Sequence, residues 1–213
     1  EREFLDAIET VIYNIESYDT TTVRASVGNY LISKYIRENT DCKVIFNGDG
    51  SDEVTGGYMY FHYAPDKYSF DKECRRLLEN ISYHDVLRSD RSISSNGLEA
   101  RTPFLDRDFV NTYLNAPIDM RYHRGNNQCE KHLLRESMSD LNLLPEEVLW
   151  RRKEAFSDGV SGQKSWFEVV QEYVKKNIYP DVKEDGISEF IDEQVNRFKF
   201  FNNRPRTLEQ LYY

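Results

Sequence analysis

The sequence has 213 residues, enough to bury a sizeable hydrophobic core without disulfides or structural metals. Its formal net charge of -9 argues against a nucleic-acid binder, because such proteins usually carry a basic surface that releases condensed counterions. No apolar run approaches the roughly 20 residues needed to cross a bilayer, so we expect no membrane contact.

Two amphipathic helices are predicted at the start of the chain. Apolar residues recur at the spacing of one helix face from Phe4 to Ile15, which predicts a helix over residues 3–16. Asp19 and Thr20 offer oxygens that can cap the start of a second helix. The apolar positions of this second helix are Val23, Val27, Leu31, Tyr35 and Ile36.

A short strand and a tight turn follow these helices. Residues 44–46 form a continuous apolar run bounded by polar residues, which is typical of a strand buried on both faces. The run ends in a glycine-containing turn, and residues 51–54 then begin a short helix that closes at Gly56 and Gly57. This is the position at which α/β proteins bind their ligands.

The remainder of the chain is predicted to be almost entirely helical. Apolar patterns indicate helices at residues 66–80, 82–93, 104–115, 129–140, 145–150, 165–179, 187–199 and 207–213. Loops are predicted at residues 94–97, 121–128 and 157–164, the last with the composition of a lid or surface connection. Viewed alone, the chain is therefore expected to look nearly all-helical.

The turn after the strand concentrates carboxylates. Gly48 and Gly50 allow unusual backbone angles and the close approach of a ligand, while Asp49, Asp52 and Glu53 gather three acids. Helix capping by Asp49 explains the same residues without chemistry, and spacing alone does not decide between the two interpretations. Because carboxylates repel a naked phosphate, a nucleotide at this turn would be bound through Mg²⁺, with Asp52 as the better ligand candidate.

Several other site types are excluded by inspection. A Walker loop needs a Gly-Lys-Ser/Thr ending, and an EF-hand needs a glycine where Asp52 stands. The histidines have no HxxxH or HExxH spacing, which argues against a metal cluster. The three cysteines are odd in number and widely spaced, so neither a disulfide framework nor a zinc site is predicted, and we expect a reducing, cytoplasmic location.

Five segments of the chain form an ordered set: Tyr13–Asp19, Gly48–Tyr58, Gly97–Asp106, Glu130–Arg135 and Trp150–Gly159. In sequence, order and spacing this set resembles the synthetase domain of glutamine-dependent asparagine synthetases, over about residues 10–175. Five segments in the right order are far more specific than any one of them. The resemblance implies a three-layer α/β fold of the adenine nucleotide alpha-hydrolase-like (PP-loop ATPase) type, to which this chain contributes mostly helices and about one core parallel strand.

The resemblance also implies a reaction. That family uses ATP and Mg²⁺ to convert the β-carboxylate of aspartate to β-aspartyl-AMP with release of pyrophosphate. Ammonia, which a separate glutaminase domain makes from glutamine, then displaces AMP. An asparagine-forming ligase is therefore expected, with aspartate, ATP and ammonia as substrates.

Residue by residue, the resemblance places the nucleotide and the metal at the acidic turn. Asn47 and Gly48 match the pair that lines the nucleotide pocket. Asp49 matches the residue implicated in handling the incoming ammonia. Asp52 matches the acid associated with Mg²⁺ and pyrophosphate.

Three further residues match the catalytic network. Asp85 and Arg88 match an acid and an arginine on the substrate side, and Lys153 matches the lysine that stabilises charge on the transferring phosphates. Plainer interpretations exist, because Asp85 and Arg88 also suit a surface ion pair on one helix and Lys153 ends a basic run. Glu99 and Arg101 flank a predicted turn and are predicted to be structural.

The chain also departs from the family pattern. The pyrophosphate loop, Ser-Gly-Gly-x-Asp-Ser-Ser, is missing from these residues and is expected upstream of Glu1, and the glutaminase domain is missing too. The family usually has serine where Asn47 stands and glutamate where Asp49 stands. The shorter Asp49 side chain moves the carboxylate by about 1.5 Å, which puts efficient ammonia transfer in doubt.

We therefore expect residues 1–213 to be the C-terminal portion of an asparagine synthetase domain, inactive alone, with the glutaminase segment as its partner in the same protein or as a separate subunit. A homodimer is compatible with the sequence. Two alternatives stay open. One is a ring-closing adenylating ligase of the β-lactam synthetase type, whose members tend to carry tyrosine at the position of Asp49, and the other is a degenerate binding subunit.

Overall fold

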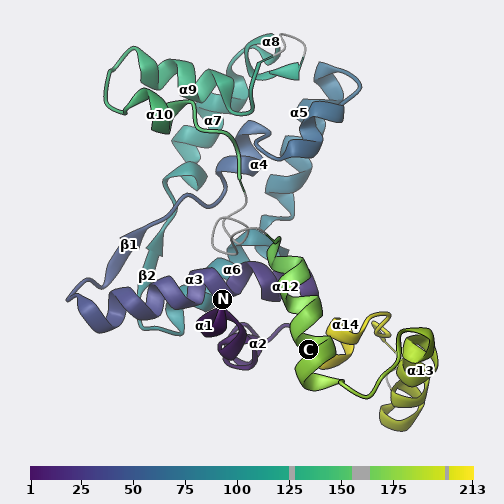
Figure 1. The fold of residues 1–213 in the computed structure, drawn as a ribbon. Helices are drawn as coiled ribbons and strands as arrows, with labels where there is room; N and C mark the ends of the chain where they lie inside the picture. The colour runs from purple at the N-terminus through teal and green to yellow at the C-terminus, as the bar shows by residue number, and fades with distance from the viewer. Residues whose placement is uncertain (125–127, 155–163, 200–201) are drawn as a thin grey trace. The chain divides into compact units, whose positions relative to one another are not determined.

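A computed structural model describes residues 1–124, 128–154, 164–199 and 202–213. The chain divides into two compact units (Figure 1). The first unit takes its residues from 1–41, 91–97 and 155–213, and the second from 42–90 and 98–154. Most of the predicted loop at 157–164 lies outside the described residues, as do residues 125–127 of the loop predicted at 121–128.

The first unit is helical in its described residues. Its elements are α1 (Arg2–Asp6), α2 (Ile8–Ile15), α3 (Thr20–Asn39), α12 (Trp166–Tyr173), η5 (Val174–Ile178), η6 (Glu184–Gly186), α13 (Ile187–Phe198) and α14 (Leu208–Tyr212). One hydrophobic core joins them, and its fully buried members include Ile8, Val11, Val23, Val27 and Val170. The apolar stripe predicted for the first helical region therefore lies in this core, as do Val23, Val27 and Leu31 of the second. The prediction is wrong for Tyr35, which is 65% exposed.

Asp19 caps α3 as predicted, since its carboxylate accepts a hydrogen bond from the Thr22 N–H at 2.8 Å. The single helix predicted over residues 3–16 is wrong in one respect, because it is split into α1 and α2 at Ala7. The helix predicted at 165–179 continues from α12 into a π-helical turn, in which the Tyr179 N–H bonds the carbonyl of Val174. Apolar periodicity does not register either local change, because the buried face continues across both.

The second unit holds both strands. Its elements are β1 (Val44–Phe46), α4 (Ser51–Thr55), η1 (Met59–Tyr63), α5 (Lys67–Glu79), η2 (Ile81–Tyr83), α6 (Asp85–Ser94), β2 (Glu99–Arg101), η3 (Pro103–Leu105), α7 (Arg107–Asn115), α8 (Ile118–Arg121), α9 (His132–Ser139) and α10 (Glu146–Leu149). The last residues of α6 belong to the first unit. Helix α4 packs against α5 and α7 (Figure 1).

β1 and β2 pair in parallel, with Ile45 opposite Ala100. The turn predicted between Glu99 and Arg101 is wrong, because these residues form β2. Their Glu-Ala-Arg sequence lacks an apolar pattern, and the strand conformation comes from pairing with β1. The prediction that β1 is buried on both faces is also wrong for the described residues, since Val44 and Phe46 are 46% and 78% exposed. Mostly helical structure with a small parallel sheet agrees with the α/β expectation.

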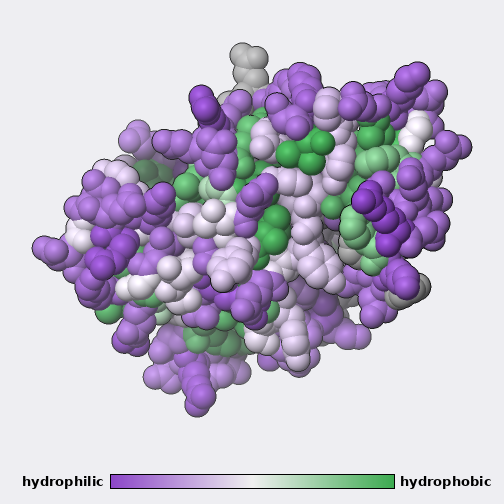
Figure 2. All heavy atoms as spheres, turned by 90° about the horizontal axis from the view of Figure 1, so that it is seen from below, coloured by the Kyte–Doolittle hydropathy of each residue, from purple (hydrophilic) through white to green (hydrophobic). Residues whose placement is uncertain are grey.

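The described parts of the chain contain no helix long and apolar enough to cross a membrane. On the face drawn in Figure 2, hydrophilic side chains predominate and hydrophobic ones gather in separate patches. Cys74 is buried, whereas Cys42 and Cys129 are exposed.

The buried imidazole of His123 makes the stability of the second unit depend on pH. His123 is 1% exposed, and neither ring nitrogen has a hydrogen-bond partner among the residues that the structure describes. Burial, together with the nearby His62, lowers the pKa of His123 to about 4. The unfolded chain takes up this proton near pH 6.5, so the stability present above pH 6.5 falls with decreasing pH, by about 2 kcal/mol at pH 5.

Replacing this group tests the origin of the pH dependence. His123→Phe keeps a ring beside Phe70, whose centroid lies 5.3 Å from that of His123, and removes the proton. We expect the urea-unfolding free energy of His123→Phe to fall less between pH 7 and pH 5 than that of the wild type. His84→Gln, at an exposed position, should keep the wild-type dependence. Equal pH dependence in wild type and His123→Phe would contradict this assignment.

Candidate active site at the acidic turn

The turn between β1 and α4 is shaped by glycine. Gly50 has a φ of 85°, in the left-handed region, and a Cβ there would lie 2.2 Å from Leu105 Cδ2. Gly50 is the N-cap of α4, and no side chain caps that end. The interpretation of Asp49 as a helix cap is therefore wrong. At Gly48 a Cβ would meet no described atom within 4 Å, so packing within the chain does not require glycine at that position.

Asp49 belongs to a small hydrogen-bonded group. The Ser89 hydroxyl donates to Asp49 Oδ2, the Asn47 amide donates to Ser89 Oγ at 3.1 Å, and the Asp49 N–H donates to Asn47 Oδ1 at 3.2 Å. Burial raises the pKa of the Asp49 carboxyl and outweighs the opposing effects of Ser89 and Arg88. Asp49 therefore holds a proton more readily than an exposed aspartate.

Asp52 is held between two lysines. Lys131 Nζ lies 2.8 Å from Asp52 Oδ1, and Lys153 Nζ lies 2.6 Å from Asp52 Oδ2. Burial favours the protonated carboxyl, but the two ammonium groups outweigh it and keep the pKa of Asp52 below its usual value. An ionised carboxylate with two ammonium groups leaves one net positive charge, which suits an anion such as a phosphate group.

Lys131 is a site residue that the sequence analysis did not single out. Its ammonium group also donates to Ser51 Oγ at 2.9 Å, and its backbone has a φ of 59°, which is uncommon outside glycine. A Cβ at Gly57 would lie 2.1 Å from Asp52 Oδ1 and 2.5 Å from Lys131 Cε, so this ion pair requires glycine there. The one signal in the sequence was that Lys131 lies in one of the segments that carry the family resemblance.

Asp85 and Arg88 form an ion pair of 2.8 Å, and each side chain is only 19% exposed. The Tyr58 hydroxyl donates to Asp85 Oδ2 at 2.7 Å and also contacts Glu53 Oε1. Burial alone would raise the pKa of Asp85. Contacts with Glu53, Arg88 and Tyr58 outweigh burial and bring the pKa of Asp85 below its usual value. The pKa of Glu53 is raised by burial and by Asp85. Glu53 therefore holds a proton more readily than Asp85, whose negative charge is paired with Arg88.

The seven predicted site residues therefore lie in one unit, and all of them except Gly48 form three groups. Asn47 and Asp49 meet through a serine, Asp85 pairs with Arg88, and the remaining contact joins Asp52 to Lys153. Ser89, Tyr58 and Lys131 complete these groups and were not predicted as site residues. Glu53 also belongs to them, and the sequence had indicated it only as one of the acids of the turn. Serine, tyrosine and lysine are common in every protein, so their type alone gave no signal.

A magnesium site is not built by these side chains as they lie. Mg²⁺ takes oxygen ligands, commonly one or two carboxylates with water and phosphate oxygens. Both oxygens of Asp52 are engaged by ammonium groups. The described residues also contain no cluster of three or more acids, histidines or cysteines that could hold a metal. The metal role of Asp52 stays a prediction.

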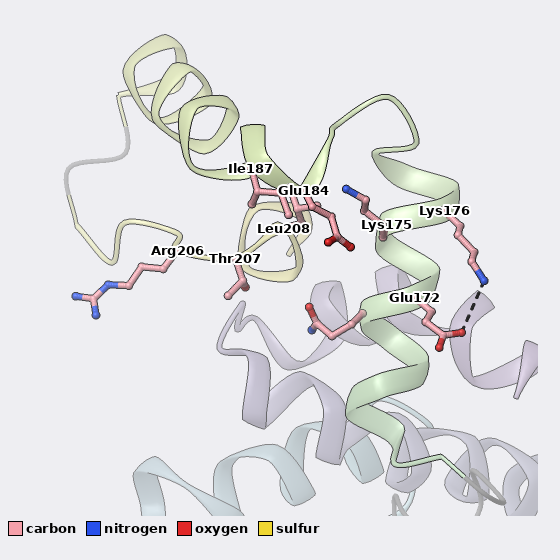
Figure 3. Close-up of a pocket in the computed structure, with 9 residues that line it drawn as sticks. Glu172, Lys175, Lys176, Glu184, Ile187, Arg206, Thr207 and Leu208 are labelled. Atoms are coloured by element: carbon pink, nitrogen blue, oxygen red, sulfur yellow. Dashed lines mark ion pairs between the residues drawn. The ribbon is translucent and has the colours of Figure 1, made fainter.

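A separate pocket of about 550 Å³ lies in the first unit (Figure 3). Figure 3 shows Glu172, Lys175 and Lys176 along one helix and Arg206 on the segment opposite. Lys175 donates to the carbonyl of Val182, and Lys176 pairs with Glu172 at 3.8 Å. Lys175 and Lys176 of this pocket thus have partners, and no predicted site residue lines the pocket. The acidic turn is therefore the better candidate site.

Comparison with known proteins finds similar sequences over most of the chain. A family model described as "Asparagine synthase" matches residues 1–72 and 64–204. The chain is 50% identical over 212 residues to the glutamine-hydrolysing asparagine synthetases of Mus musculus and Homo sapiens, and 48% identical to that of Gallus gallus. These alignments cover 99% of this chain and 36% of each relative, so the chain spans about a third of their length.

The two glycines of the turn should respond differently to substitution. Gly50→Ala forces a left-handed alanine against Leu105 and should cost about 2 to 4 kcal/mol of unfolding free energy. Gly48→Ala meets no such contact and should cost less than about 1 kcal/mol. Urea unfolding of both variants checks this difference. Equal destabilisation would show that the turn geometry described above is wrong.

Proposed function

The chain belongs to the asparagine synthase family, and on this premise we propose that it supplies part of the active site of an ATP-dependent ligase that converts aspartate to asparagine. The observation that carries the proposal is Asp52 held between Lys131 and Lys153, next to the Asp49 and Asp85 groups. This places cations and ionisable acids together, as a reaction between a carboxylate and a triphosphate requires.

In the proposed reaction an oxygen of the aspartate β-carboxylate attacks the α-phosphorus of ATP, and the bond to the β-phosphate breaks. β-Aspartyl-AMP forms and pyrophosphate leaves. The nitrogen of ammonia then attacks the acyl carbon, AMP leaves with the bridging oxygen, and loss of a proton from the nitrogen gives the amide. Ammonia is proposed to come from glutamine, through the glutaminase segment of the same protein or a separate subunit.

Lys131 and Lys153 are proposed to face the phosphates. Negative charge grows on the leaving pyrophosphate, and ammonium groups held in place beforehand stabilise it without reorganisation. Asp52 orients both ammonium groups through its two oxygens. Because the three groups carry one net positive charge, a phosphate oxygen can approach the lysines without displacing Asp52.

Asp49 is proposed to act in the ammonia step. A carboxyl whose pKa is raised by burial is a better proton acceptor than an ordinary aspartate, which suits removal of a proton from the attacking nitrogen. Asn47 and Gly48 are proposed to line the nucleotide, and the open space at Gly48 supports a close approach. Asp85 and Arg88 are proposed to hold the aspartate substrate.

The remaining expectations stay predictions. A Mg²⁺ ion bound with ATP would compete with two ammonium groups for Asp52. The three-layer PP-loop fold would use β1 and β2 as two strands of a larger parallel sheet. A cytoplasmic location is predicted from cysteine usage.

Aspartate-dependent exchange between ATP and labelled pyrophosphate in the full-length protein tests the proposal. We expect exchange in the wild type and a loss of about 100-fold or more in Lys153→Met, because a preorganised cation is removed. Lys72→Met, at an exposed position of the same unit, is the matched control and should exchange like the wild type. No exchange with any carboxylic acid would refute the catalytic proposal. Exchange with an amine-bearing acid but not with aspartate would favour the ring-closing alternative.

Residues 1–213 alone are predicted to form no asparagine from aspartate, ATP and ammonia, because they span about a third of the relatives' length. The measurement is amino-acid analysis of the product, with the full-length protein under the same conditions as the positive control. Asparagine formation by residues 1–213 would contradict this prediction and show that they contain a complete site.

A further inference from the structure

Tyr58 contacts two of the three groups that make up the candidate site. Its hydroxyl lies 2.7 Å from Asp85 Oδ2 and also contacts Glu53. Its ring lies beside the ammonium group of Lys153, whose Nζ is 5.9 Å from the ring centroid. Tyr58 thus joins the Asp85 group, through its hydroxyl, to the Asp52 and Lys153 group, through its ring.

The hydroxyl is a donor to an ionised acid. A phenol has a single proton, so it can donate to one of the two carboxyl groups at a time. Asp85 pairs with Arg88 at 2.8 Å and is the ionised partner, which makes it the stronger acceptor. Without the Tyr58 hydroxyl, Asp85 would keep the ion pair between Oδ1 and Arg88 and lose the hydrogen bond that Tyr58 donates to Oδ2.

The ring restrains the lysine. An ammonium group within about 6 Å of an aromatic centroid is attracted to the ring, and the attraction grows where water is excluded. Lys153 Nζ is therefore held from two sides, by Asp52 and by the Tyr58 ring. Tyr58 is itself fixed by stacking on Tyr60, with centroids 5.9 Å apart and an interplanar angle of 10°.

We propose that Tyr58 is a positioning residue for both substrates of the adenylation step, aspartate and ATP. Its hydroxyl sets the orientation of Asp85 toward the aspartate substrate, and its ring sets the position of Lys153 toward the phosphates. The inference rests on the proposed function for the roles of Asp85 and Lys153. Because hydroxyl and ring act on different groups, their effects are separable by substitution.

Two variants of the full-length protein separate them in the exchange assay. Tyr58→Phe keeps the ring and should raise the KM for aspartate roughly tenfold or more, with the KM for ATP near the wild-type value, because one hydrogen bond to a charged group is lost. Tyr58→Leu removes the ring as well and should also lower kcat several-fold. Tyr60→Phe loses a hydroxyl bonded to Glu73 and is the matched control, expected to behave like the wild type.

The inference is overturned if Tyr58→Phe has the same KM for aspartate as Tyr60→Phe. It is also overturned if Tyr58→Phe raises the KM for aspartate and the KM for ATP equally. A double-mutant cycle on urea-unfolding midpoints decides the structural part without any activity. The shifts of Tyr58→Phe and Asp85→Asn should not add in the double variant, whereas those of Tyr60→Phe and Asp85→Asn should. Additive shifts for Tyr58→Phe and Asp85→Asn overturn the inference, whether or not the wild type shows exchange. Absence of exchange in the wild type refutes the proposed function and is a separate result.

Discussion

Asp52 forms ion pairs with two lysine ammonium groups, and the second unit's site depends on this arrangement. A largely buried carboxylate is costly unless it is paired, and removal of one partner leaves charge without compensation. Lys131 and Lys153 come from segments far along the chain, so this one acid fixes where both segments lie against the turn. The close approach also requires a residue without a Cβ at Gly57.

Asp49 and Asp52 are three positions apart, yet their surroundings shift their pKa values in opposite directions. Burial dominates at Asp49, whose partners are a serine hydroxyl and a more distant guanidinium group. Two ammonium groups dominate at Asp52. Different environments for adjacent acids allow one turn to hold a proton acceptor beside a fixed anion. The same division recurs at Glu53 and Asp85, where one carboxyl is raised in pKa and its neighbour is lowered.

The helical part of the fold was largely predictable because burial of one helix face repeats at a fixed spacing. The cap at Asp19 and the positions of most helices follow from local sequence. β2 was not predictable in this way, since its Glu99-Ala100-Arg101 sequence carries no strand pattern and depends on hydrogen bonds to β1. The prediction that β1 is buried on both faces was wrong because burial also depends on distant parts of the chain. A local apolar run indicates a tendency to be buried but does not specify which residues cover it.

The sequence by itself determined the acidic turn, the ordered segments and the family they indicate, since these depend only on residue identity and spacing. Only the tertiary structure decided that Gly50 rather than Asp49 is the N-cap of α4, and that Lys131 shares Asp52 with Lys153. It also decided that Tyr58 bridges the acids and the lysine. The physical reason is that these contacts join side chains distant in sequence, so they exist only once packing brings their backbones together.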